Sequence, residues 1–479
     1  MDFPASRLVG LLSLCALAAA CRAEPPRPPN ILVVIADDQS VSTLGPDAPA
    51  WLRTPALDAL ADGGVVFRRA FVTTSLCSPS RASMLTGQYA RRHGIWDNRE
   101  GLPQGTPTYP ALLGAAGYDT GYFGKWHLGR DEGARPGFSE SISYAGQGRY
   151  FGAEFLNGRS GERVTPDGWV DDVTTDFAIE FIGRPRTRPF LAVVGFKGPH
   201  RPRKPPARRA DMYEDVPLPV PPNSRSFPPF PMFHEFVALA KAHGVPLERF
   251  SPAENWREEW EGPRESQLAH EPRMGDDDYL RDYYRVITAL DDDVGRLLAK
   301  LDEMGITRDT LVVYVSDNGI ANGEHGLAGK RTAYEESMRV PLLLRYPARV
   351  EAGARDAIAL NVDLAPTLLD YAGVQVPDSM QGRSLRPVIE GRSRGWRNDL
   401  FYEFRMGSLQ YMASWVPTLR AVRTAREKLV VYEGYPGWTE LYDLDADPFE
   451  MNDLSRDPAS RSRRDRLEAR LVELAAEAQ

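Results

Sequence analysis

Residues 30–38 read "NILVVIADD". The six apolar residues from Ile31 to Ala36 lack the polar alternation of a half-exposed strand. They predict a strand buried on both faces, as in a parallel sheet covered by helices. Two acidic residues, Asp37 and Asp38, follow at once. Because ligands of open α/β sheets bind outside the carboxyl ends of the strands, this stretch predicts both a fold class and one side of a binding site.

Strand and helix signals continue to alternate along the chain. We expect strands in residues 118–124, 189–196, 310–319 and 339–347, and helices in residues 54–64, 108–117, 171–182, 277–305 and 361–373. Thr54 is expected to cap the first of these helices, with Pro55 at its first position. The pattern predicts an α/β fold: a large mixed, mostly parallel sheet sandwiched by helices.

The pattern changes after residue 385. Short strand signals at residues 399–404, 418–424, 428–434 and from 440 onward predict a small antiparallel sheet, and residues 463–478 predict a final helix. We therefore divide the chain into an export signal (1–23), a catalytic domain (24–385) and a C-terminal α+β subdomain (386–479). Inside the catalytic domain, residues 201–275 are rich in proline, arginine and tryptophan, and we expect a surface excursion that frames a binding site.

The N-terminal residues predict export. Arg7 precedes the apolar run "LVGLLSLCALAAA" (residues 8–20), which is shorter than the roughly 20 residues of a membrane span and suits a signal peptide. Two routes remain open: lipidation of Cys21, or secretion after an Ala-x-Ala site. We expect a periplasmic or secreted protein, anchored to a membrane in the first case. The net charge of −8 argues against a nucleic-acid partner.

Cys77 opens the segment "CSPSRASMLTG" (residues 77–87), and the other two cysteines lie inside or beside the export signal. An intramolecular disulfide is therefore excluded in the folded body. Pro79 suits the first turn of a helix that Gly87 would end, so residue 77 lies at a helix N-terminus, where free amides favour an anion. Arg81 lies one turn further on. A buried, inert thiol is the alternative interpretation.

A second expected strand ends as the first does, because residues 310–316 lead into Asp317 and Asn318. Three carboxylates and one amide form an all-oxygen set that suits Ca²⁺ or Mg²⁺ and not Zn²⁺. Either acidic pair alone is explained as well by turns or helix caps. Both pairs together predict a metal site, since three converging acids repel one another unless a cation intervenes.

Four basic side chains also follow expected strands. Lys125 and His127 are alternate residues just past one strand, so both can project to the same side. His200 follows another strand, and Lys330 ends the glycine-rich loop "GEHGLAGK". Taken singly, each is more typical of a surface or structural residue. Their shared position after strands predicts a joint site.

Together these segments resemble the sulfatase family of the alkaline-phosphatase superfamily. "CSPSRASMLTG" fits the family pattern Cys-x-Pro-Ser-Arg followed by Leu-Thr-Gly. "GKWHLG", "SDNG", "GEHGLAGK" and "YEESMRVPLLLRYP" occur in the expected order. The resemblance is nearer to bacterial glycan sulfatases, of the glucosamine-6-sulfatase and iduronate-2-sulfatase type, than to the aryl type.

The resemblance implies an alkaline-phosphatase-like fold and a sulfuric ester hydrolase that acts on a sulfated sugar or glycan. It implies that a generating enzyme oxidises Cys77 to Cα-formylglycine before the chain folds. One hydroxyl of the hydrated aldehyde would attack sulfur to give a covalent sulfo-enzyme, and the other would then expel sulfate. One Ca²⁺ would be bound by Asp37, Asp38, Asp317, Asn318 and an oxygen of residue 77.

The same resemblance assigns the remaining side chains. Arg81 would hold the hydrated aldehyde, and Lys125 and Lys330 would bind the sulfate oxygens. His127 and His200 would move protons, with His200 the first candidate for the acid that protonates the leaving alcohol. The assignment of the two histidines as acid or base stays open. Basic residues after His200, namely Arg201, Arg203 and Lys204, are candidates for contact with a polyanionic glycan, with a solvated basic loop as the alternative.

Two other functions remain open. Phosphonate and phosphate ester hydrolases of the same superfamily also use formylglycine, and two lysines alone do not separate sulfate from phosphate. An exported glycan-binding protein that lacks the modification, and hence activity, is the second alternative.

Overall fold

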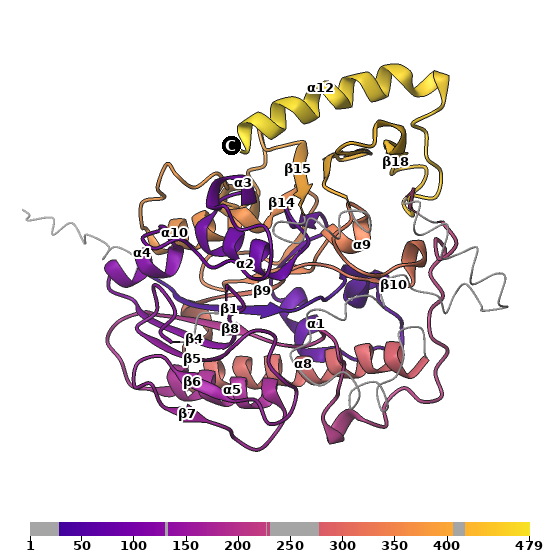
Figure 1. Ribbon diagram of the computed structural model, residues 1–479. Helices are drawn as coiled ribbons and strands as arrows, with labels where there is room; N and C mark the ends of the chain where they lie inside the picture. The colour runs from indigo at the N-terminus through magenta and orange to yellow at the C-terminus, as the bar shows by residue number, and fades with distance from the viewer. Residues whose placement is uncertain (1–27, 130–132, 227, 230–276, 406–416) are drawn as a thin grey trace, which may run out of the picture.

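Strand β1 (Asn30–Ala36) lies in the middle of a ten-stranded sheet, as its continuous apolar sequence predicts (Figure 1). It pairs in parallel with β8 (Phe190–Gly195) on one side and with β9 (Thr310–Ser316) on the other. Beyond β8 follow β4 (Asp119–Lys125) and β5 (Glu140–Tyr144), again in parallel. The carboxyl ends of these five strands therefore lie along one edge of the sheet.

The outer strands make the sheet mixed, as predicted. β12 (Leu342–Arg345) is antiparallel to β9 and to β2 (Val65–Phe67), and β13 (Gly353–Arg355) pairs in parallel with β2. At the opposite edge, β6 (Phe155–Asn157) and β7 (Arg163–Val164) add two antiparallel pairs. This computed structural model describes residues 28–129, 133–226, 228–229, 277–405 and 417–479.

Two predicted segments lie partly or wholly outside the described residues. They are the export signal at 1–23 and, within the expected surface excursion, residues 227 and 230–275. In the part of the chain that the structure describes, the search for a helix long and apolar enough to span a membrane finds none.

Helices cover both faces of the sheet because β1 is apolar on both. Ile31, Val33 and Ile35 belong to one core cluster, together with residues of three helices: α2 (Cys77–Thr86), α4 (Tyr109–Ala115) and α10 (Leu364–Ala372). The alternate residues belong to a second cluster, with residues of α1 (Pro55–Asp62), α5 (Val170–Gly183) and α8 (Asp277–Glu303). Figure 1 shows the two helical layers above and below the sheet.

The N-terminus of α1 differs from the prediction. The Thr54 side chain makes no capping hydrogen bond. Asp291, on α8, accepts hydrogen bonds from the backbone N–H groups of Ala56 (3.1 Å) and Leu57 (2.8 Å) instead. A carboxylate offers two acceptor oxygens and a negative charge to the positive end of the helix, whereas threonine offers one neutral oxygen.

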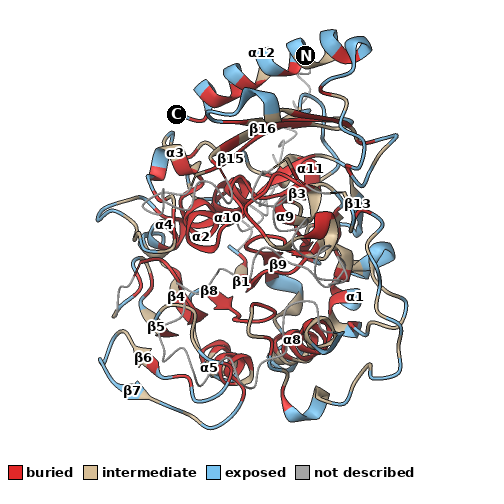
Figure 2. Ribbon diagram, turned by 45° about the vertical axis from the view of Figure 1, so that its right-hand side comes forward, coloured by how far each residue is buried: buried red, intermediate tan, exposed pale blue. Residues whose placement is uncertain are grey.

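The chain ends in a second sheet of four antiparallel strands, as predicted. Its order is β15 (Asp399–Phe404), β16 (Leu419–Thr424), β17 (Glu427–Tyr432) and β18 (Glu440–Asp443). Helix α12 (Arg461–Glu477) covers one face (Figure 2). The other face packs on side chains of the large unit. The residue boundaries of the three predicted regions stay a prediction.

The remaining short elements connect these layers. They are β3 (Ala70–Phe71) paired with β14 (Ala359–Leu360), β10 (Ala321–Asn322) paired with β11 (Ala328–Gly329), and the helical turns α3 (Ala90–His93), α9 (Glu335–Met338) and α11 (Arg386–Ile389). α9 follows β9 in the chain and contacts the C-terminal sheet through Glu335, which pairs with Arg423 and Lys428.

Candidate active site

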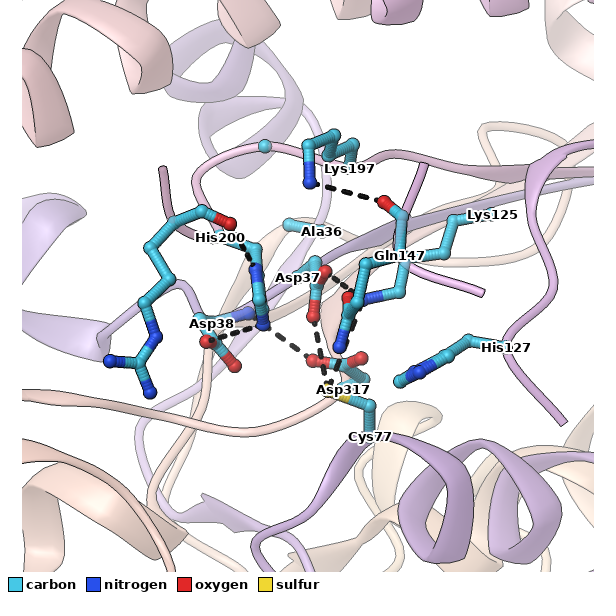
Figure 3. A network of polar contacts seen from close by, with 12 residues as sticks. Ala36, Asp37, Asp38, Cys77, Lys125, His127, Gln147, Lys197, His200 and Asp317 are labelled. Carbon is cyan, nitrogen blue, oxygen red and sulfur yellow. Dashed lines mark hydrogen bonds and ion pairs between the residues drawn. The ribbon is translucent and has the colours of Figure 1, made fainter. Parts of the chain in front are cut away.

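Cys77 is the first residue of α2 and is fully buried. The helix ends at Thr86, where Gly87 takes a positive φ of 65°, the conformation that glycine adopts most easily. The N-terminus of α2 points toward the carboxyl edge of the large sheet, beside Asp37 and Asp317 (Figure 3). Cys77 Sγ lies 3.4 Å from Asp37 Oδ1. The sequence pattern thus leads to a thiol held at a helix N-terminus and at the strand ends.

Three carboxylates converge on this thiol. One oxygen each of Asp37, Asp38 and Asp317 and the sulfur of Cys77 all lie within 4.8 Å of one another, and all four residues are buried. The Asn318 Nδ2 group donates to Asp38 Oδ1, while Asn318 Oδ1 is buried without a hydrogen-bond partner among the described residues. These oxygens can hold a divalent cation.

Three cations partner the three carboxylates. Lys125 Nζ contacts Asp37, and Lys330 Nζ contacts Asp38. Arg81 Nε donates to Asp317 Oδ2 at 2.8 Å. Lys330 Nζ also lies 2.9 Å from the sulfur of residue 77. The cationic groups therefore converge on the first residue of α2, where an anionic substrate group can bind to them.

Two histidines flank the thiol. His200 Nδ1 lies 2.5 Å from the carbonyl oxygen of Arg201, which assigns the proton to Nδ1, and its Nε2 lies 3.7 Å from Asp38 Oδ2. His127 Nδ1 is buried without a hydrogen-bond partner among the described residues. Burial and the neighbouring lysines hold the pKa of both imidazoles well below the usual range, so both rings are neutral before an anion enters.

Burial also controls the acidic groups. It raises the pKa of Asp37 to about 7, with a further contribution from Asp317, while Lys125 opposes the rise. Burial and the charge of Asp37 raise the pKa of the Cys77 thiol well above its usual range. Because the thiolate is the nucleophilic form of cysteine, the unmodified residue is a poor nucleophile here.

Two residues of this site are absent from the sequence-based prediction. The Gln147 side-chain oxygen accepts a hydrogen bond from Lys125 Nζ, and the Gln147 carbonyl accepts one from Lys197 Nζ at 3.1 Å (Figure 3). Burial and Lys125 lower the pKa of Lys197 to about 8. Asp171, on α5, accepts from the backbone N–H groups of Lys197 and Gly198 and fixes this loop. Both missed residues follow strands, so the same carboxyl-edge rule is the signal that points to them.

The structure brings every predicted site residue to this edge, and their chemical roles stay predictions. The buried set is Asp37, Asp38, Cys77, Arg81, Lys125, His127, His200, Asp317, Asn318 and Lys330. Arg203, a candidate for glycan contact, is also buried: it donates to Asn322 Oδ1 at 2.5 Å and lies over the rings of Tyr279 and Tyr283. Its guanidinium packs on these rings in the described conformation, and a contact with a glycan stays a prediction.

A model of the sulfatase family matches residues 29–374, a range that holds all ten of these residues. The chain belongs to the sulfatase family. A second model, described as the C-terminal region of N-sulphoglucosamine sulphohydrolase, matches residues 323–477. Like its relatives, this sulfatase is a sulfuric ester hydrolase.

Individual relatives agree with the expected likeness to bacterial glycan sulfatases. This sulfatase is 32% identical to an N-acetylglucosamine-6-O-sulfatase of Bacteroides thetaiotaomicron, over 93% of this chain and 86% of the relative. It superposes with a TM-score of 0.80 and 29% identity on a protein solved in complex with its substrate D-glucosamine-2-N,6-O-disulfate, covering 94% and 98% of the two chains.

One similar structure belongs to a different hydrolase. The phosphonate monoester hydrolase of Agrobacterium radiobacter superposes with a TM-score of 0.72 and 25% identity, covering 94% of this chain and 96% of that one. The shared fold therefore accompanies both sulfur and phosphorus ester chemistry.

Proposed function

We propose that this sulfatase removes sulfate from a sulfated carbohydrate, with a hydrated Cα-formylglycine at position 77 as the nucleophile and a covalent sulfo-enzyme as the intermediate. One observation carries the proposal: residue 77 begins α2 with four buried oxygen-bearing side chains and three cations gathered around it. That arrangement suits an oxygen nucleophile attacking an anionic ester.

The surroundings of residue 77 support an oxygen nucleophile at this position. The unmodified thiol is fully buried, and its raised pKa makes it a poor nucleophile. An aldehyde hydrate supplies two hydroxyls in the same place. Because Cys77 is inaccessible in the folded protein, a generating enzyme has to act before folding is complete.

The donor set fits one Ca²⁺. Asp37, Asp38 and Asp317 supply carboxylate oxygens, and Asn318 Oδ1 is a buried acceptor without a donor among the described residues. An all-oxygen set of this charge matches a hard divalent cation. When bound, the ion offsets the repulsion between the carboxylates and favours the ionised form of an oxygen that it holds.

The basic residues hold the sulfate group. Lys330 Nζ already lies 2.9 Å from the atom of residue 77 that the nucleophilic oxygen would replace. Lys125 and Lys330 would exchange part of their contact with Asp37 and Asp38 for the sulfate oxygens. Arg81 keeps its bond to Asp317, and its Nη1 donates to the carbonyl oxygen of Lys125 at 2.7 Å. These two bonds hold α2 and the end of β4 in place. These charges stabilise the equatorial oxygens in the transition state.

Protons move in two stages. In the first, one hydroxyl of residue 77 gives its proton to the Asp317 carboxylate and forms a bond to sulfur, the ester S–O bond breaks, and the sugar oxygen takes a proton. We assign that proton to His200, whose pKa rises when the sulfate anion enters.

In the second stage the other hydroxyl gives its proton to His127, whose Nδ1 has no other partner among the described residues. The C–O bond to sulfate then breaks, and the aldehyde forms again. Water adds to it and restores the hydrate.

The relatives indicate the first substrates to test. One is named an N-acetylglucosamine-6-O-sulfatase, and one solved structure holds D-glucosamine-2-N,6-O-disulfate. We therefore propose a 6-O-sulfated glucosamine unit of a glycan as the substrate of this chain.

Mass spectrometry and turnover test the proposal together. In protein from the native host, the tryptic peptide from Ala70 to Arg81 should be lighter by the difference between a thiol and an aldehyde. The same preparation should release sulfate from 6-O-sulfated glucosamine, and Cys77→Ala should not. A residue 77 found wholly as cysteine would contradict the mechanism.

A matched pair of substrates tests the alternative that this enzyme hydrolyses phosphorus esters, as the similar phosphonate monoester hydrolase does. A sulfate ester and a phosphate ester of the same alcohol should be compared at equal enzyme concentration. We expect faster turnover of the sulfate ester, and the opposite ranking would favour the phosphorus ester function. A non-catalytic glycan-binding protein would bind sulfated glycans without turning over either ester.

We further propose that the enzyme is exported, from Arg7, the apolar run at residues 8–20 and Cys21. Labelling with a radioactive fatty acid separates the two routes. A labelled band that Cys21→Ser removes means a lipoprotein, and an unlabelled periplasmic or secreted protein means cleavage by the ordinary route. Protein retained in the cytoplasm would contradict export.

A further inference from the structure

A second group of acidic and imidazole side chains, two of them buried and one partly buried, lies between the large sheet and the C-terminal sheet. His325 lies in the turn after β10, Glu336 on α9 and Glu450 after β18. One ligand atom from each lies within 4.8 Å of the others. None of the three belongs to the active site. They are called the His325 cluster below.

His325 aims an unpartnered nitrogen into this group. Its side chain is 1% exposed, and its Nδ1 lies 2.9 Å from the carbonyl oxygen of Ser226. That contact assigns the proton to Nδ1 and leaves a lone pair on Nε2. Nε2 lies 3.8 Å from Glu336 Oε2, and neither atom has a hydrogen-bond partner among the described residues. The ring stacks on Tyr334 at 3.7 Å between centroids, which fixes its direction.

Asn223 holds the other oxygen of Glu336. Its Nδ2 donates to Glu336 Oε1 at 2.9 Å and to the carbonyl of Phe449 at 3.2 Å. Its own Oδ1 is fully buried and has no donor in the described part of the chain. A buried polar atom without a partner costs about 1–3 kcal/mol of stability. This group holds three such atoms, namely His325 Nε2, Glu336 Oε2 and Asn223 Oδ1, which indicates that a ligand binds here.

Three carboxyl groups and two cations meet in this region. Lys428 Nζ lies 2.6 Å from Glu450 Oε1 and 2.9 Å from Glu335 Oε1, and Arg423 pairs with Glu335 at 3.2 Å. Both cations are therefore engaged with Glu335 and Glu450, and Glu336 faces the imidazole of His325 instead. Burial raises the pKa of Glu450 to about 8 and also raises that of Glu336. A bound cation would favour the ionised form of these carboxyl groups.

We propose that His325, Glu336 and Glu450 bind a divalent transition-metal ion of the Zn²⁺ or Mn²⁺ type. An imidazole nitrogen with carboxylate oxygens is the ligand set of such ions, whereas Ca²⁺ takes oxygen ligands alone. Asn223, whose Nδ2 donates to Glu336 Oε1, offers its buried side-chain oxygen as a candidate further ligand. The site is separate from the all-oxygen set beside Cys77.

Such an ion would join three parts of the chain. It would connect the turn that leads to Lys330, the helical turn α9 and the loop after β18 of the C-terminal sheet (Figure 1). Lys330 is one of the residues that we place on the sulfate group. The ion would therefore fix the loop that carries this lysine to the C-terminal sheet.

Metal content of the full-length protein tests the proposal. Protein is dialysed against ZnCl₂ or, separately, MnCl₂, passed through a desalting column, and analysed by inductively coupled plasma mass spectrometry. Cys77→Ala serves as the background, because Asp37, Cys77 and His200 also lie close enough to take zinc while residue 77 is a thiol. CaCl₂ is included throughout to keep the all-oxygen set beside residue 77 occupied, and we expect about one equivalent of Zn²⁺ or Mn²⁺ per chain in that background.

Two histidine variants make the result specific. Adding His325→Gln should abolish retention of the ion, and adding His93→Gln should leave it unchanged. His93 is the matched control because it is equally buried and bonds to Ser83, away from both clusters. Equal metal content in the His325→Gln protein and its parent, or no retained ion in the parent, overturns the proposal.

Folding of the variant does not limit the test. Crystals of the Cys77→Ala protein soaked in ZnCl₂ should show an anomalous peak at bonding distance from His325 Nε2. An empty density map at that position overturns the proposal, since it means that a proton on Glu336 bridges the gap to Nε2.

Discussion

The active site and the His325 cluster are both buried groups of carboxylates and cations, yet they arise from different parts of the fold. In the active site the acids follow β1 and β9, which the sheet places side by side. In the His325 cluster they come from a four-residue helix and from turns, which packing between the two sheets, ion pairs and a hydrogen bond hold together. Acids at strand ends can be read from a sequence, and acids on turns cannot.

The two groups also differ in charge balance. Asp37, Asp38 and Asp317 each have a cation of their own. Beside the His325 cluster, Arg423 and Lys428 pair with Glu335 and Glu450, and Glu336 faces His325. Each carboxylate of the active site thus has a cation that a sulfate can draw away, whereas Glu336 forms no ion pair with a lysine or arginine among the described residues. We expect changes in the first to affect turnover and changes in the second to affect stability.

The largest expected effect is that of Asp317→Ala on turnover. The change removes one carboxylate of the proposed Ca²⁺ site and leaves the buried Arg81 without its partner. We expect kcat/KM for a sulfated glucosamine to fall by about a thousandfold or more, because charge stabilisation in a buried site is lost. Added Ca²⁺ should raise the melting temperature of the wild type and not of the variant. Unchanged turnover would refute the assigned metal site.

Lys428→Met should have the opposite effect to Asp317→Ala, with a loss of stability and no loss of turnover. Lys428 is fully buried and pairs with Glu335 and Glu450, so its removal leaves Glu450 without a cation and Glu335 with Arg423 alone. We expect a loss of about 3–5 kcal/mol in the free energy of unfolding, measured by urea denaturation, with kcat of the folded fraction retained. The matched control is Lys300→Met, at a partly exposed pair with Glu303, where we expect less than about 1 kcal/mol. An equally small loss of stability in Lys428→Met would contradict the expectation that changes beside the His325 cluster affect stability.

Asp291 is a buried carboxyl group that backbone amides hold in place of a cation, because it accepts hydrogen bonds from two N–H groups of α1. Its pH dependence therefore shows how well amides alone stabilise such a group. Burial raises its pKa to about 6, and the hydrogen bonds from Leu57 and Ala56 oppose that rise. Relative to the unfolded chain, folding therefore favours the protonated carboxyl. Its contribution to stability is complete below about pH 4 and is lost as the pH rises through about 6.

The free energy of unfolding of the wild type should accordingly fall, relative to that of Asp291→Asn, by on the order of 2 kcal/mol between pH 4 and pH 8. Urea denaturation of both proteins at each pH measures the difference. Parallel pH profiles of stability for the two proteins would mean that the Asp291 carboxylate, which caps α1, stays ionised from pH 4 to pH 8.

The smallest expected effect is that of Gln147→Leu, which removes the side-chain acceptor of Lys125 Nζ. Lys125 keeps its ion pair with Asp37, so its ammonium group stays near the site but is held less firmly. We expect kcat/KM to fall about tenfold, in line with the loss of one hydrogen bond to a charged group. The modification state of residue 77, measured on the same peptide, should be unchanged. A drop as large as that of Asp317→Ala would make Gln147 part of the central machinery.

Much of the active site could be predicted because its signals are local. Continuous apolar residues define β1 and β9, the acidic pairs follow them directly, and Pro79 and Gly87 mark the start and end of α2. Parallel strands share one edge, so local patterns were sufficient to bring these residues together. Gln147 and Lys197 follow strands as well, but their bonds to each other and to Lys125 depend on the loops.

By itself, therefore, the sequence determined the order of strands and helices, the buried central strands, the place of Cys77 at a helix N-terminus and the acids at the strand ends. Only the tertiary structure decided that Asp291 caps α1, that Arg203 is buried against Tyr279 and Tyr283, and that His325 meets Glu336 and Glu450. The physical reason is range: the first set depends on residues within a few positions of one another. The second depends on contacts between segments far apart in the chain, which form only when the layers pack.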